Sequence, residues 1–580
     1  MHRLTTGLVL VGICVVLLAL CTYGLLRYYR EKSVSFGYSL TIYITWFLGF
    51  IGMILYPVDI GYSIADKAAN PKIKLIWVGV YWFTFFLAWV YIPIMMEYWA
   101  SGEFKPSSRF KESLWVNAKF YVNLVPLIVV IVIWYLIAKK GDTSGVQGLI
   151  IALSNTYGLL FVIFLLGPGL VELPINLWRR RDQHRALEAL YQKAYKLDAA
   201  KYEYEYKVVS LKMNLQDLQK TIISAKKSPR IQTIISDMIL SMPSDEAINL
   251  RRHSAGVIDK SEWLVIPLLD CVNMTDAKLI DRLSAMNSKL KKTCLVYERK
   301  INQYEECIDS ILSLKADLNE TVTDANGQSL PFQIDRSKPG RVFHTFWLRI
   351  RSVCLGLTSV VCGCLSIAIL LTELTTLGFP FWKKSLSIIG APLHHIHNNS
   401  MLRTFMSAVP LTYLFICFFR SFFLLRIPFV ESYHLYYHHT DVYALSFNAY
   451  YLCRLQYSLC YHYFTLLQMD EQAYESIALS SLLGEMKTIP FLGSEFNFYV
   501  PAIVFLVSVF TFGKMMWPAK KKADTLLDSG VDEVKAGQEL VVLTLKRRAR
   551  EVLNVEVTTM PSVYSYQSPV VSHSGRKAIA

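Results

Sequence analysis

Long apolar segments, separated into two groups by a polar stretch, restrict the fold of this chain more than any other feature. A helix needs about 20 apolar residues to cross a hydrocarbon core about 30 Å thick. Such segments fill residues 1–178 and recur in residues 345–517, whereas residues 179–344 between them are polar. The sequence therefore predicts an all-α, polytopic membrane helical bundle of about nine transmembrane helices, five before the polar insert and four after it.

The basic residues beside the apolar segments predict the orientation. Arg27, Arg30 and Lys32 directly follow the first segment, which favours an uncleaved helix with its N-terminus outside over a signal peptide. Alternating sides from there places residues 179–344 and the C-terminus in the cytosol. The eighth span fits least well, because it is rich in tyrosine and contains Arg454. The expected spans are 6–29, 37–56, 75–98, 117–138, 149–171, 347–372, 402–426, 441–467 and 498–517.

The overall composition agrees with a membrane protein. Of the 580 residues, 53% are hydrophobic, which is high for a soluble chain. The formal net charge of +15 arises largely from cations beside apolar runs, where they set topology and meet lipid head groups, so we do not expect nucleic acid as a partner. The 11 cysteines fall in apolar spans or in the insert, and we therefore expect no disulfide framework.

The insert carries two heptad seams, over 187–225 and over 280–318. These seams predict an antiparallel coiled-coil hairpin whose arms, about 60 Å long at 1.5 Å per residue, stand on the membrane like a stalk. Residues 228–276 contain several prolines and form its tip. The seam positions that define the hairpin are Leu190, Leu197, Leu211, Leu215, Leu218, Leu283, Leu290, Ile301, Ile308 and Ile311.

Two interpretations of the insert stay open. In the first, the two arms only pack against each other. In the second, the tip docks a protein partner through the apolar run Ile231–Leu240. After the last span, residues 518–580 are predicted to form a basic, partly disordered cytosolic tail with a short helix near 533–553.

Ionisable residues at membrane depth are candidates for function, because burying them there is expensive. Four such residues are Asp59, Glu97, Glu172 and Arg454. The alternative is that Arg454 pairs with a carboxylate or a helix end while the other three lie at the membrane interface. Prolines near Asp59 and Glu172 could instead break helices and open a path for a substrate.

Histidines just before the eighth span form a second candidate group. His434 and His438 are four residues apart, and His439 and Asp441 follow. Such spacing could hold a metal ion, but no further ligand is fixed by spacing, so we expect interfacial packing and no metal. Sequence motifs for nucleotide binding, zinc proteases and serine hydrolases are absent, and we therefore expect neither a cofactor nor enzymatic activity.

Short motifs at the span junctions resemble the limb-region membrane protein family, of lipocalin-interacting receptor type, and most of all its domain-containing-protein-two branch. The likeness covers nearly all of residues 1–517. The motifs that carry it are LYPVD at 55–59, YW at 81–82, Trp89, Pro93, SGEF at 101–104, NTYGL at 155–159, LGPGLVELP at 166–174, HHTDVYAL at 438–445, CRL at 453–455, MK at 486–487, Tyr499 and Pro501.

This resemblance implies nine spans, an outer N-terminus, a cytosolic coiled-coil loop and a receptor-like or regulatory role. Members of the family are assigned to plasma membrane signalling, and one branch to lysosomal vitamin handling. The chain departs from the branch in residues 57–74, which form a shorter loop without cysteine. The resemblance therefore does not carry over any ligand contact made by that loop.

Two hypotheses follow. The first is a receptor or adaptor of the plasma membrane, with endosomal or lysosomal membranes as the alternative, whose coiled coil binds cytosolic or membrane proteins. The second is a transporter for a small organic or amphipathic solute, with a path beside Asp59, Glu172 and Arg454. Both have the lipid bilayer as a partner, and the second adds a lipid or small-solute ligand.

Overall fold

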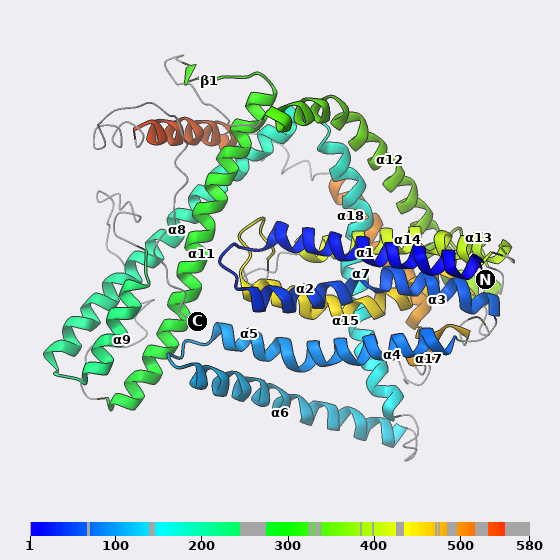
Figure 1. Cartoon of the computed structure of the whole chain (residues 1–580), viewed down its shortest axis with the longest axis horizontal. Coiled ribbons are helices and arrows are strands. Elements are labelled where there is room, and N and C mark those ends of the chain that lie inside the picture. The colour runs from blue at the N-terminus through cyan, green and yellow to red at the C-terminus, as the bar shows by residue number, and fades with distance from the viewer. Residues whose placement is uncertain are drawn as a thin grey trace.

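The computed structural model is almost entirely helical (Figure 1). Its membrane bundle contains α1 (His2–Tyr29), α2 (Phe36–Phe50), α3 (Gly52–Asp66), α4 (Pro71–Phe86), the π-helical turn η1 (Leu87–Tyr91), α5 (Ile92–Ala100), α6 (Pro106–Ala138), α7 (Val146–Arg179), α12 (Lys338–Trp382), α13 (Ala391–His395), α14 (Ser400–Leu424), α15 (Val442–Leu467), α17 (Ala478–Leu483) and α18 (Phe496–Met516). The structure describes residues 2–66, 70–138, 146–243, 274–323, 329–330, 338–382, 385–396, 399–424, 434–469, 473, 476–483, 496–516 and 532–550.

The multi-span membrane fold is confirmed. Among the described residues, eight helical segments are long and apolar enough to cross a membrane. They correspond to eight of the nine predicted spans, and α2 with α3, and α4 with α5, each form one crossing. The segments are Val9–Tyr29, Phe36–Ser63, Pro71–Ala100, Pro106–Ile137, Tyr157–Arg179, Ile350–Gly378, Ser400–Leu424 and Tyr499–Met516.

The remaining predicted span is α15, which lies inside the bundle. Its 26 residues reach about 39 Å at 1.5 Å per residue, enough for one crossing. Its sequence is too polar to stand among the eight apolar segments, but its side chains are mostly buried by α2, α5, α7 and α14. A helix surrounded by other helices can carry polar groups because they meet protein partners and not lipid.

The insert is built from α8 (Gln183–Ser224), α9 (Pro229–Leu240) and α11 (Asp276–Asp317), followed by the short strands β1 (Val322–Thr323) and β2 (Ser329–Leu330). The carboxylate of Asp182 accepts hydrogen bonds from the backbone amides of His184 and Arg185, and so caps the N-terminus of α8. Helices α8 and α11 pack side by side in opposite directions (Figure 1).

The predicted seam forms the contact between these two helices. Leu190, Leu197 and Ile301 are partly buried at this contact, and the other seam positions are fully buried. The buried ones are Leu211, Leu215, Leu218, Leu283, Leu290, Ile308 and Ile311. Supercoiling of the pair stays a prediction.

One expectation about the insert is wrong, and one of the two interpretations of its tip loses the surface it relied on. The helix pair does not stand as a stalk but lies across one end of the bundle, because α11 contacts bundle loops along much of its length (Figure 1). The run Ile231–Leu240 does not present its apolar face to a partner, because that face packs on α8 and α11. Leu240, with 81% of its surface exposed, is the exception. Residues 244–273 of the predicted tip lie outside the described residues.

A helix over 532–550 follows the last span and packs against α8 and α11. Val541 is buried among apolar residues of both helices. Gly537 lies so close to α8 that a Cβ atom there would come within 2.3 Å of the carbonyl oxygen of Tyr191. The helix predicted near 533–553 is therefore present, and residues 551–580 lie outside the described part of the chain.

Candidate functional site: the insert junction

The insert meets the bundle at two loops, which we call together the insert junction: residues 100–102 and residues 436–441, both against α11. The second loop is also tied to the end of α1. The backbone amide of Thr440 donates to the carbonyl of Tyr29 at 3.1 Å, and the amide of Glu31 donates to the carbonyl of Thr440 at 3.1 Å. The loop is thus held by α1 immediately before α15 begins.

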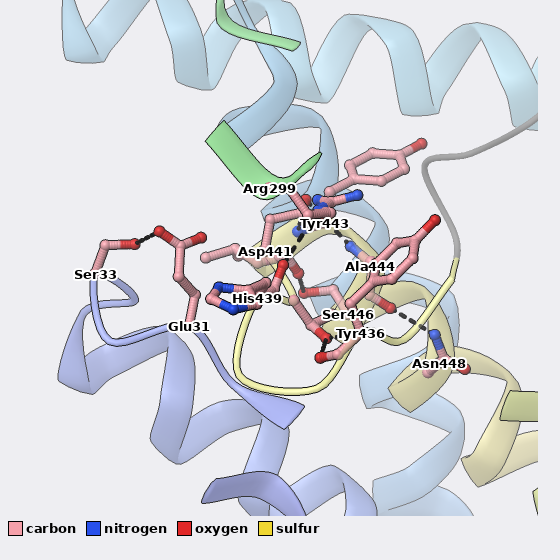
Figure 2. Close-up of polar contacts among 12 residues, drawn as sticks. Glu31, Ser33, Arg299, Tyr436, His439, Asp441, Tyr443, Ala444, Ser446 and Asn448 are labelled. Atoms are coloured by element: carbon pink, nitrogen blue, oxygen red, sulfur yellow. Dashed lines mark hydrogen bonds and ion pairs between the residues drawn. The ribbon is translucent and has the colours of Figure 1, made fainter. Parts of the chain in front are cut away.

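Asp441 is the N-cap residue of α15. One of its carboxylate oxygens accepts hydrogen bonds from the backbone amides of Tyr443 at 3.1 Å and Ala444 at 3.4 Å (Figure 2). These amides are otherwise unpaired at a helix N-terminus, and the helix dipole favours a negative charge there. Asp441 therefore determines where the central helix of the bundle starts.

The other carboxylate oxygen of Asp441 binds Arg299 of α11. Arg299 Nη2 lies 2.5 Å from Asp441 Oδ1, and the two side chains are only 3% and 5% exposed (Figure 2). The guanidinium also donates through Nε to the carbonyl of His439 at 3.1 Å and lies over the ring of Tyr436. Removing one partner would leave the other charge buried and unpaired, which is strongly unfavourable.

His439 forms a second contact with α11. Its Nε2 lies 2.9 Å from a carboxylate oxygen of Glu306, at the edge of the junction where Glu306 is partly exposed. His438 points elsewhere: its ring packs against Tyr437 and near Tyr28. The two histidines do not converge, and the described residues contain no group of three or more metal-ligating side chains.

The loop between α5 and α6 forms the other half of the junction. Asn287 Nδ2 donates to the carbonyl of Gly102 at 2.7 Å, and Ser288 Oγ donates to the carbonyl of Ala100 at 2.8 Å. A Cβ atom on Gly102 would lie 1.9 Å from the backbone oxygen of Ser284, so only glycine allows this approach. The loop backbone therefore fits directly onto α11.

Asp59 is a structural acceptor on α3. It is fully buried and accepts four hydrogen bonds, from Ser63 Oγ, Trp77 Nε1 and the backbone amides of Ala478 and Leu479. The two amides open α17, so the carboxylate joins α3, α4 and α17. Every donor it faces comes from the protein.

The other three intramembrane candidates lie apart. Glu97, at the end of α5, experiences the positive charge of Lys292 on α11. Glu172 of α7 interacts electrostatically with Arg420 of α14. Arg454 lines a pocket with aromatic side chains. The described contacts do not join these three residues and Asp59 into one polar path.

Sequence reasoning missed Arg299 and both members of a buried pair within the bundle. Arg299 lies within the predicted second arm, where a charged residue looks solvated. Glu373 of α12 and His462 of α15 form a pair with 2.9 Å between Nε2 and Oε1, and both are buried. The signal for this pair was present, since both are ionisable residues in or beside predicted spans.

Fold and junction together define a multi-pass helical membrane protein whose polar insert is clamped onto the end of its bundle. A family profile described as LMBR1-like membrane protein matches residues 7–516. The chain therefore belongs to the LMBR1-like membrane protein family, as its span-junction motifs predicted. No solved structure matches it significantly.

Curated relatives match most of this chain. An LMBR1 domain-containing protein 2 homolog A from Dictyostelium discoideum is 25% identical over 76% of this chain and 58% of its own length. The G-protein coupled receptor-associated protein LMBRD2 of Caenorhabditis briggsae is 23% identical over 84% of this chain and 79% of its own. The human protein of that name is 23% identical over 76% and 63%. The match thus spans less than two thirds of the Dictyostelium and human relatives.

Proposed function

We propose that this chain is a non-enzymatic, receptor-associated membrane protein that regulates signalling or trafficking through its insert. The observation that carries the proposal is the buried Arg299–Asp441 pair, because it joins the insert to the first turn of the central helix. Relatives named as G-protein coupled receptor-associated proteins support a membrane receptor as the partner. The insert lies on the cytosolic side in this proposal, and the plasma membrane is favoured over endosomal or lysosomal membranes.

An exposed aromatic face of α8 is the surface that we assign to the partner. Its members recur at helical spacing on one side of the helix and are large and apolar, whereas most other α8 residues outside the seam are polar. Tyrosine and methionine are enriched at protein interfaces. The face, called here the α8 tyrosine face, consists of Tyr195, Tyr202, Tyr206 and Met213.

The insert junction couples the α8 tyrosine face to the position of α15 in the bundle. A receptor that packs against the bundle and shifts α15 would move Asp441, and with it Arg299 and α11. Binding at α8 would act in reverse, because α8 and α11 share one apolar core. Coupling between two sites is reciprocal in free energy, so the receptor's contact with α8 and its contact with the bundle should strengthen each other.

The test is capture of a co-expressed G-protein-coupled receptor by the purified full chain in neutral detergent. Tyr202→Asp places a charge at a position whose side chain is 52% exposed and should reduce receptor recovery at least tenfold. Ile223→Asp is the matched control, since Ile223 is also exposed on α8 but lies ten residues, about 15 Å along the helix, beyond Met213. Its recovery should equal that of the unmodified chain.

Asp441→Asn separates binding from coupling. It leaves the α8 tyrosine face intact but removes the charge that Arg299 requires. Receptor capture by the isolated chain should persist, whereas the receptor's agonist should no longer alter the amount of receptor captured. Equal recovery with Tyr202→Asp and Ile223→Asp would refute the assigned surface.

A further inference from the structure

Arg454 lies midway along α15, at membrane depth, and is not fully buried. Its guanidinium donates a hydrogen bond to the hydroxyl of Tyr450. It also lies over three aromatic rings, 4.3 Å from the centroid of Trp89, 5.1 Å from Tyr450 and 5.4 Å from Tyr157. Within the described part of the chain, no carboxylate pairs with it. Aromatic faces attract a cation but do not neutralise its charge.

A break in helix geometry shapes this site. The turn η1 is π-helical, and it places Trp89 beside Arg454. The carbonyl of Trp89 accepts a hydrogen bond from the hydroxyl of Tyr121 on α6. π-Helical turns are rare and occur frequently at functional sites. The local structure therefore holds an aromatic wall around a cation.

Arg454, Trp89 and Tyr157 line a pocket between α4, η1, α7 and α15. Gly158 permits close approach of α7 to α15, where a Cβ atom would lie 1.8 Å from Ser458 Oγ. Phe85 lines the same pocket and is 41% exposed, and its neighbour Trp82 is 59% exposed. The pocket therefore borders the surface that faces the bilayer.

We propose that this pocket binds the carboxylate or phosphate head group of an anionic amphiphile that enters from the bilayer. The guanidinium, with five donors in a planar fork, matches either group, and its nearest protein partner is a neutral phenol. The apolar tail lies along Phe85 and Trp82 on the lipid-facing surface. An anion of this kind supplies the charge that Arg454 lacks in the protein. The inference is independent of the function proposed for the insert.

The test is saturable binding of tritiated oleate, and separately of tritiated phosphatidate, to the purified full chain in neutral detergent. At least one of the two should bind, and the tighter one identifies the head group. Methyl oleate, which lacks the charge, and inorganic phosphate, which lacks the tail, should compete at least tenfold less well. Failure of both tritiated lipids to bind, or equal competition by methyl oleate or by inorganic phosphate, would overturn the proposal.

Variants assign the binding to this pocket. Arg454→Gln should weaken it at least tenfold, the loss expected for one charge-assisted hydrogen bond. Arg454→Lys should retain most of it, and Arg27→Gln, an exposed arginine on α1, should leave it unchanged. Phe85→Trp keeps the charge of Arg454 but narrows the pocket, so it should also lower the affinity for the lipid. This second variant tests the pocket even if Arg454→Gln does not fold. Wild-type affinity in folded Arg454→Gln, or in Phe85→Trp, would place the ligand elsewhere.

Discussion

Arg299 and Asp441 are 142 positions apart in sequence, yet they form a buried ion pair of 2.5 Å that joins α11 to the start of α15. The same carboxylate caps α15 through two backbone amides. One side chain thus serves the fold of the bundle and the docking of the insert. A change at Asp441 should therefore affect both parts of the molecule.

Asp441→Ala should destabilise the chain by about 3–5 kcal/mol, because it leaves Arg299 buried without its partner. Amide hydrogen exchange in lipid nanodiscs should then rise in the first turn of α15 and in α11 around Arg299. Glu306→Gln is the control: this partly exposed partner of His439 should contribute less than about 1 kcal/mol. Similar exchange in both variants would show that the pair does not hold the junction.

Gly102→Ala should loosen the other half of the junction. The new Cβ atom would overlap the backbone oxygen of Ser284, which cannot move without displacing α11. We expect a lower melting temperature and faster exchange of the Asn287 and Ser288 turn. Gly363→Ala on α12 is the matched control, since no atom lies within 4 Å of its Cβ position. A melting temperature equal to that of the control would contradict the close approach.

Acid should release the helix over 532–550 from the insert. Burial raises the pKa of Glu305, but the guanidinium groups of Arg548 and Arg547 outweigh it and hold that pKa below its ordinary value of 4.5. A carboxyl group with a lowered pKa in the folded state contributes stability above its ordinary pKa. That contribution is lost as the pH falls through the lowered value.

A spin label at Glu539, which is exposed, measures this release through its mobility. The label should stay immobile from pH 7 down to about 4.5 and become mobile below that value. With Glu305→Gln it should be more mobile at pH 7 and less sensitive to acid. A label whose mobility changes equally with pH in both chains would rule out Glu305 as the responsible group.

The buried pair of Glu373 and His462 should be sensitive to removal of one member. His462→Phe leaves the Glu373 carboxyl group without its hydrogen bond in a site with 0% exposure, so the melting temperature should fall clearly. The double change Glu373→Leu with His462→Phe removes both polar groups and should recover most of the loss. A double variant no more stable than His462→Phe would mean that the pair is not an isolated unit.

The sequence predicts the parts of this fold that depend on local pattern. Apolar length identifies the spans, and the heptad positions from Leu190 to Ile311 identify the α8–α11 contact. His439 and Asp441 are candidates in the sequence because they follow His434 and His438 in a polar group just before the eighth span. Their partners Glu306 and Arg299 could not be found in this way. The sequence pattern of a polar helix does not show which of its charged residues contacts a distant loop.

The orientation of the insert also depends on distant contacts. A heptad hairpin joined to two spans looks like a stalk when only its own sequence is considered. The insert lies across the bundle because Gly102 lets the loop between α5 and α6 approach α11. The carboxylate of Asp441 also pairs with Arg299 of α11. Asp59 is a comparable case, since its four donors come from three separated segments.

The most direct test of the central claim, that the insert is clamped across the bundle end, is a pulsed electron spin resonance distance. One label replaces Arg230 on α9 and the other replaces Lys111 on α6, both exposed. In the full chain in nanodiscs we predict one narrow distribution at short distance, which broadens and lengthens in Arg299→Ala. A long distance that matches a stalk about 60 Å tall, or a distribution unchanged by Arg299→Ala, would contradict the account.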